Sequence, residues 1–145
     1  MARRIFAFNV NNPPPETRDY LYNLTTVTTN AEFPQTNGEV WTKWGVPDNS
    51  QALMVYENLQ QGDIILFGHS KVGGYTHAAE VADRPGGLAP LPGWVNAETY
   101  RWCFFIKNLY QLAGTIRSSI VKGNNHRAVY MRVPEENVPQ ILNHL

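Results

Sequence analysis

The sequence has little cysteine and no excess charge of either sign. Cys103 is the single cysteine among 145 residues, so the chain can build neither a disulfide framework nor a cysteine-based metal site. It lies in the apolar run Trp102 to Ile106, where we expect a buried core thiol. Twelve basic residues balance twelve acidic ones. Any binding of a polyanion must therefore come from a local patch rather than from the net charge.

Long hydrophobic runs are also missing. No stretch approaches the roughly 20 apolar residues of a membrane-spanning helix. The N-terminus, Met1-Ala2-Arg3-Arg4, opens no apolar run of the kind found in signal peptides. Together with the lone thiol, this predicts a cytoplasmic protein. The length predicts that residues 1–145 form a single domain with one sizeable core.

Catalytic signatures are missing as well. No Gly-x-Ser-x-Gly elbow surrounds a serine, and Gly73-Gly74 does not open a helix as a phosphate-binding loop would. His69 and His77 lie on opposite arms of a predicted hairpin, and two histidines without a third ligand make a weak metal site. We therefore expect no enzyme activity, no metal and no cofactor.

The clearest element that the sequence does contain is a β-hairpin. Ile64 to Phe67 is β-branched and aromatic, as in a buried strand, and Tyr75 to Val81 forms the returning arm. Gly73-Gly74 supplies the positive φ angles of a tight reversal. Other expected strands are Ile5 to Val10, Tyr100 to Ile106 and Ala128 to Val133.

Short helices are expected between and after these strands. Asp48 or Asn49 can cap a helix whose apolar positions run from Ala52 to Leu59. Further helices are expected over Glu16 to Leu24 and Glu136 to Leu142. Leu109 to Leu112 fits a single helical turn or an irregular connection, and Thr115 to Val121 fits a helical or an extended piece. The order of elements predicts an α+β fold around a mixed or curled sheet.

Aromatic residues point to binding rather than catalysis. Trp41 and Trp44 share a face if their segment is a helix or turn, and oppose each other if it is a strand. Trp94 lies in a loop rich in proline and glycine, whereas Trp102 lies within a strand and is expected in the core. A base stacked on an exposed aromatic ring is stabilised by about 1–3 kcal/mol.

Several of these motifs together resemble the EVE and YTH branch of the PUA-like superfamily. They are Trp44 to Asn49 followed by a helix, Gly62 to Ser70, Ala78 to Val81, and Trp94 ahead of the strand Tyr100 to Lys107. The resemblance implies a PUA/EVE/YTH-like curled mixed sheet, closed into a small barrel with flanking short helices. Gly68 departs from the pattern, because EVE domains carry a tyrosine before the His-Ser pair.

The resemblance also implies a function. Members of this group are non-catalytic readers that hold a modified, often methylated, base in an aromatic cage, and DNA-binding relatives flip that base out of the duplex. Because such domains are often fused to restriction nucleases or NTPase motors, it implies an excised specificity module of a modification-dependent restriction system, with DNA favoured over RNA. The expected modified-base-binding residues are Trp41, Trp44, Trp94, Asn9, Asn11 and His69.

Contacts to the nucleic-acid backbone are expected from polar and basic residues. The candidates are Ser70, Lys71, Arg117 and Lys122. Two other functions remain open. One is an ASCH-like enzyme acting on a small nucleoside or RNA, for which Lys71, Lys107 and Glu80 are the available groups. The other is a protein-interaction domain that docks a partner through exposed tryptophans.

Overall fold

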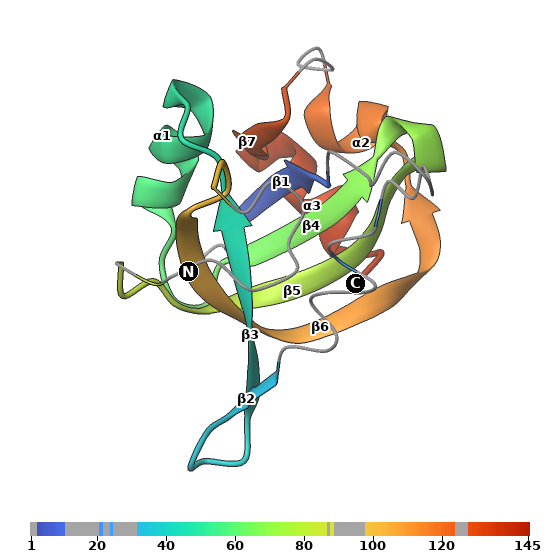
Figure 1. Cartoon of the computed structure of the whole chain (residues 1–145). Helices are drawn as coiled ribbons and strands as arrows, with labels where there is room; N and C mark the ends of the chain where they lie inside the picture. The colour runs from blue at the N-terminus through green and yellow to red at the C-terminus, as the bar shows by residue number, and fades with distance from the viewer. Residues whose placement is uncertain are drawn as a thin grey trace.

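One mixed sheet organises the chain (Figure 1). The computed structural model describes residues 3–10, 21, 24, 32–86, 88, 98–123 and 128–145. In this part, seven strands follow the order β2-β3-β6-β5-β4-β1-β7. The strands are β1 (Ile5–Asn9), β2 (Glu32–Pro34), β3 (Val40–Val46), β4 (Ile64–His69), β5 (Gly74–Asp83), β6 (Trp102–Ile116) and β7 (Tyr130–Arg132). Only β1 and β4 pair in parallel among these strands.

The sheet is curled but open, which corrects the prediction of a small barrel. Figure 1 shows β6 sweeping around beneath the other strands while β2 and the start of β3 project away from the body of the domain. Barrel closure requires the two outermost strands to hydrogen-bond to each other. Here β2 and β7, each three residues long, are the two edges of the sheet. The observed fold is therefore an α+β domain on an open mixed sheet.

Short helices flank the sheet, as predicted. They are α1 (Ser50–Asn58), α2 (Ser118–Lys122) and α3 (Val138–Leu142), with 3-10 turns η2 (Ser70–Val72) and η3 (Glu135–Asn137). The predicted cap of α1 is confirmed at Asn49, whose Oδ1 accepts the N–H of Ala52 at 2.9 Å. The predicted helix over Glu16 to Leu24 lies outside the described residues, apart from its positions 21 and 24. A helix with the length and apolarity to cross a membrane is not found in the described part.

Two hydrophobic clusters pack on opposite faces of the sheet, because side chains alternate along each strand. Phe6 and Phe8 of β1 join the cluster that α1 covers. Ile5 and Ala7 join the cluster that includes residues of α2 and α3. Cys103 is buried in the core, as predicted from its apolar neighbours.

β6 is longer than the sequence pattern predicts. It continues to Ile116, so Leu109 to Leu112, left open between a helical turn and an irregular connection, is strand. Three register shifts interrupt its pairing with β5, and Asn108 adopts a φ of 55°. Bulges of this kind break the alternation of apolar residues on which strand prediction depends. Trp102 was expected in the core, but it opens β6 and is 36% exposed.

Candidate nucleic-acid interface

The carboxyl ends of β1 and β4 lie side by side and carry several of the predicted site residues. The two strands are parallel and Asn9 pairs with Gly68, so both strands end at the same edge of the sheet. His69 ends β4, and η2 then presents Ser70 and Lys71, both exposed. We call this surface the strand-end rim.

Arg117 joins the strand-end rim from β6. Ile116, the last residue of β6, pairs with Tyr75, so the chain leaves β6 beside the start of β5. The approach is close, because a Cβ added to Gly74 would lie 3.1 Å from the Cα of Arg117. Arg117 is exposed. The fold therefore places Arg117 beside the hairpin turn that carries Lys71.

His69 holds the turn that presents Lys71. Its Nδ1 accepts the backbone N–H of Lys71 at 3.0 Å and caps η2. Burial lowers the pKa of His69, and the nearby charges of Lys122 and Lys71 lower it further. A ring nitrogen can accept this hydrogen bond only when it is unprotonated. His69 in this position therefore serves the turn in its neutral form.

The histidines predict a loss of stability in mild acid. Burial also lowers the pKa of His77, so both groups have folded-state pKa values below their ordinary 6.5. Between the folded and unfolded pKa values the unfolded state binds more protons, so the free energy of unfolding falls as pH falls through this window. Urea titrations between pH 7.5 and 5, in steps of about half a unit around the ordinary histidine pKa, are expected to show a smaller slope for His77→Gln than for wild type. Equal slopes would contradict this assignment.

Asn9 is oriented by a buried tyrosine. The Tyr75 hydroxyl donates to the Asn9 Oδ1 at 3.1 Å, and Tyr75 is 1% exposed. Burial raises the pKa of Tyr75, so its hydroxyl stays protonated and remains a donor. With its oxygen engaged, Asn9 can offer its amide N–H groups to a ligand. The sequence interpretation did not single out Tyr75, although pairing along the predicted hairpin would have placed it near Gly68.

Lys122 lies beneath this pair instead of on the surface. Its side chain is buried, its Nζ donates to the Ala128 carbonyl at 2.6 Å, and it lies 5.8 Å from the Tyr75 ring centroid. Burial lowers the pKa of Lys122. Because its amine faces the protein interior, we leave Lys122 out of the surface that is available to phosphates.

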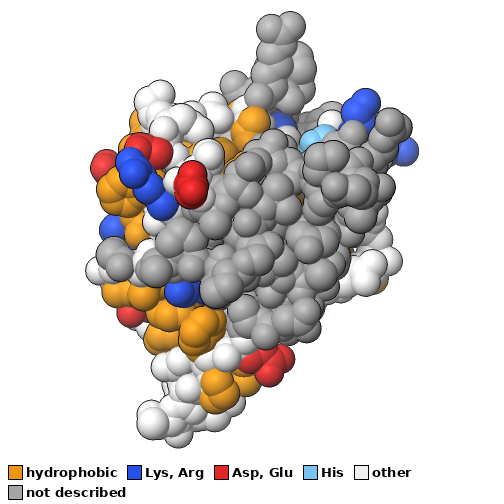
Figure 2. All heavy atoms as spheres, viewed as in Figure 1, with side chains coloured by type: hydrophobic (Ala, Val, Ile, Leu, Met, Phe, Trp, Pro, Cys, Tyr) orange, Lys and Arg blue, Asp and Glu red, His pale blue; other side chains and the backbone are white. Residues whose placement is uncertain are grey.

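The two tryptophans of β3 lie on opposite faces of the strand. Trp44 is buried, and its ring centroid lies 4.6 Å from that of Phe67 in the cluster under α1. Trp41 is half-buried on the other face, 5.4 Å from the Phe105 centroid. Figure 2 shows hydrophobic side chains gathered near the base of the projecting β2–β3 hairpin. Since β3 is regular, it does not bring both indoles into one cage.

Asn9 does not share the face of Trp44 either. Along β1, Phe8 belongs to the cluster that contains Trp44, whereas Asn9 points to the side of Tyr75. The predicted base-binding residues that the structure describes thus lie in three separate places. Asn9 and His69 lie at the strand-end rim, Trp44 lies in the core, and Trp41 lies on the β2–β3 hairpin. Trp94 and Asn11, the other predicted base-binding residues, lie outside the described part of the chain.

Two of the three residues proposed for an ASCH-like enzyme lie together, and the third lies apart from them. Lys107 forms ion pairs with Glu39 at 2.6 Å and with Glu80 at 3.4 Å. Glu80 pairs with Ile64 at the start of β4, whereas Lys71 follows the end of that strand. Within the described residues there is also no group of three or more potential metal ligands. The geometry therefore joins Lys107 and Glu80 as a close pair and leaves Lys71 apart from them.

Comparison with known proteins identifies a fold. No family model matches the sequence, and no curated protein matches it. Among solved structures, the chain is similar to the YTH domain-containing protein mmi1 in complex with RNA. The TM-score is 0.53 at 14% sequence identity, over 97% of this chain and 80% of that one. The fold is therefore YTH-like, which confirms this part of the predicted resemblance.

Proposed function

We propose that this domain is a non-catalytic reader that binds nucleic acid through the strand-end rim and holds a modified base. The observation that carries the proposal is the gathering of Asn9, His69, Lys71 and Arg117 at one end of a YTH-like sheet. Lys71 and Arg117 are cations available to phosphate oxygens, and Asn9 offers amide hydrogens to a base or sugar. The structural neighbour with RNA bound is consistent with a nucleic-acid partner.

In this proposal the tryptophans have different tasks. Trp44 is 3% exposed and packs on Phe67, on another face than Asn9, so we assign it to the core and not to contact with the base. We assign an open wall of the cage to Trp94 and an edge contact to Asn11, both on the basis of the sequence. Trp41 is a separate stacking surface on the β2–β3 hairpin. A buried methyl group contributes roughly 0.8 kcal/mol, and the void left by an unmethylated base adds to the discrimination.

The finer proposal is that the ligand is DNA carrying a methylated base, which is extruded from the base stack. The domain would then serve a modification-dependent restriction system. An associated nuclease or NTPase would then supply the chemistry that this domain lacks. This choice of DNA rests on the sequence resemblance, whereas the structural neighbour is an RNA complex. Both polymers therefore belong in the test.

The test is a fluorescence titration with matched oligonucleotides. Single-stranded DNA and RNA are each prepared unmodified, with one N6-methyladenine and with one 5-methylcytosine. We expect one methylated oligonucleotide to bind about fourfold more tightly than its unmodified match, the ratio given by one buried methyl group. Equal affinities across the set would remove the modified base from the proposal, and no binding to any of them would remove nucleic acid.

A further inference from the structure

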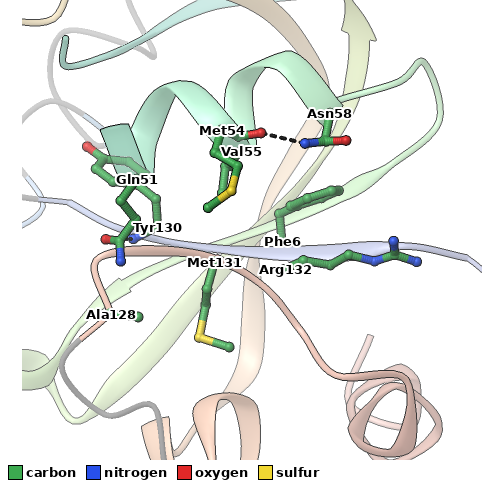
Figure 3. Close-up of a pocket in the computed structure, with 9 residues that line it drawn as sticks. All are labelled: Phe6, Gln51, Met54, Val55, Asn58, Ala128, Tyr130, Met131 and Arg132. Carbon is green, nitrogen blue, oxygen red and sulfur yellow. Dashed lines mark hydrogen bonds between the residues drawn. The ribbon is translucent and has the colours of Figure 1, made fainter. Parts of the chain in front are cut away.

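A groove runs between α1 and the edge strand β7, apart from the strand-end rim. It encloses about 450 Å³. Figure 3 shows Met54 and Val55 of α1 above the groove and Phe6 of β1 beside them, with β7 below. We call it the edge groove.

One wall of the edge groove is a single stripe of α1. Gln51, Met54, Val55 and Asn58 are spaced i, i+3, i+4 and i+7, so they lie on one side of the helix. Met54 is 62% exposed although this side of the helix faces the sheet. Its thioether chain is therefore available to pack against another apolar group.

The other wall is a sheet edge with main-chain groups directed outward. The bonds from Val133 N–H to the Ile5 carbonyl and from Asn9 N–H to the Val129 carbonyl point the odd-numbered residues of β7 toward β1. The peptide groups of Tyr130 and Arg132 consequently point away from β1. Gln51 Oε1 accepts the N–H of Tyr130 at 3.3 Å. On the edge of β7 that faces away from β1, the Tyr130 carbonyl and the Arg132 peptide group have no hydrogen-bond partner among the described residues.

The opposite edge of the sheet is protected differently. β2 contains Pro34, which has no N–H to donate, and Glu32, an exposed charge. Proline and charge are the usual devices that keep an edge strand from pairing with another chain. β7 carries no proline, and a helix with an apolar stripe flanks it instead. Of the two edges, β7 is therefore the one without proline, and Gln51 of α1 accepts the Tyr130 N–H there.

One end of the edge groove carries arginine side chains. A second cavity of about 320 Å³ shares Arg132 with the groove and is also lined by Glu135 and by Arg3 and Arg4, which form ion pairs with Glu80 and Asp63. Arg132 is 48% exposed, and its ion pair with Glu135 is 3.7 Å long with Glu135 83% exposed. An ion pair in that setting is weak. Arg132 can therefore exchange Glu135 for a carboxylate brought by a ligand.

We propose that the edge groove binds an extended peptide segment of another protein, which adds to β7 as a strand. The peptide backbone pairs with the Tyr130 carbonyl and the Arg132 peptide group, an apolar side chain packs on Met54 and Val55, and a carboxylate of the peptide meets Arg132. This matches the general mode in which main-chain bonds give affinity and flanking pockets give specificity. The apolar walls disfavour a phosphate backbone as the occupant.

A selection from a random heptapeptide phage library tests this proposal. The library is panned on the whole chain and in parallel on Met54→Lys, with Val40→Lys as the matched control. Val40 is also an exposed apolar residue, 44% accessible, but it lies on β3. We expect wild type and Val40→Lys to enrich the same peptides, with apolar residues at alternate positions and an acidic residue. Met54→Lys is expected to weaken the best synthetic peptide by about tenfold.

Two further measurements make the result decisive. N-methylation of alternate amides of that peptide is expected to abolish binding, and Arg132→Glu is expected to weaken it about tenfold. Enrichment of no peptide, or affinity unchanged by N-methylation, would overturn the proposal. So would sedimentation showing that wild type self-associates through Met54, because the occupant would then be a second copy of the chain. Oligonucleotide binding should be unchanged in Met54→Lys, so this proposal fails or succeeds independently of the reader function.

Discussion

Gly68→Ala is expected to destabilise the domain by about 3 kcal/mol, the upper part of the usual range for overpacking a core. A Cβ at this position would lie 2.1 Å from the Gly74 carbonyl oxygen and 2.5 Å from the Tyr75 Cα. Both atoms belong to the backbone of the neighbouring strand, so no side-chain rotation relieves the clash. The register shift between Phe67 and Gly68 is the place where the two arms of the hairpin come this close.

Gly114→Ala is the matched control. Gly114 also lies in a strand of the same sheet, but a Cβ there would have no atom within 4 Å. We expect urea unfolding to show a change of no more than about 0.5 kcal/mol for an open surface position. If the two variants unfolded at the same urea concentration, the close approach at Gly68 would be refuted.

The same close approach accounts for the glycine at position 68, where the sequence differs from the EVE pattern that it resembles. EVE domains have a tyrosine before the His-Ser pair, where this chain has Gly68. Here the Gly74 and Tyr75 backbone occupies the space that a larger side chain would need. The ring of Tyr75 packs in the core on this side, and its hydroxyl reaches Asn9. The departure therefore reflects a local closing of the hairpin beneath the strand-end rim.

Charge reversal on the strand-end rim has the second large expected effect. Lys71→Glu and Arg117→Glu should each reduce affinity for a single-stranded oligonucleotide by about tenfold near 0.1 M salt, because each lost phosphate contact removes about one released counterion. Each change should also reduce the slope of log K against log salt by about one. Both residues are exposed, so stability should change by less than about 0.5 kcal/mol. Fluorescence titrations at several salt concentrations measure both quantities.

Arg101→Glu is the control for these two variants. Arg101 is exposed and immediately precedes β6, whereas Arg117 immediately follows it, so the same substitution is made at opposite ends of one strand. Arg101 forms an ion pair with Asp48, and its side chain is 58% exposed. We expect its affinity and salt slope to stay near those of wild type. A loss equal to that of Arg117→Glu would mean that the strand-end rim has no special role.

The hairpin and the cap of α1 could be predicted because their causes are local. Gly73 and Gly74 adopt φ angles of 93° and 135°, as the tight reversal required. Asn49 accepts from Ala52 within the first turn of its own helix. Each interpretation depended on residues within a few positions of one another, so the sequence pattern contained the relevant physics.

Features that depend on distant segments could not be predicted in this way. β6 extends to Ile116 because β5 pairs with it through bulges, which the pattern of apolar residues does not reveal. The burial of Lys122 depends on Tyr75 and Ala128, which approach from other elements. The separation of Trp41 from Trp44 became definite only when β3 proved to be a strand. The strand-end rim itself depends on the parallel pairing of β1 with β4. These strands are distant in the sequence, since β1 ends at Asn9 and β4 begins at Ile64.

Mapping of amide shifts by NMR with a methylated oligonucleotide tests the reader proposal most directly. Spectra are recorded with the methylated oligonucleotide that binds best in titration and with its unmodified match. We expect the methylated one to shift the amide signals of Asn9, His69, Lys71 and Arg117 at concentrations where the unmodified one shifts them much less. Identical shifts from both oligonucleotides, or shifts confined to other parts of the sheet, would contradict the proposal.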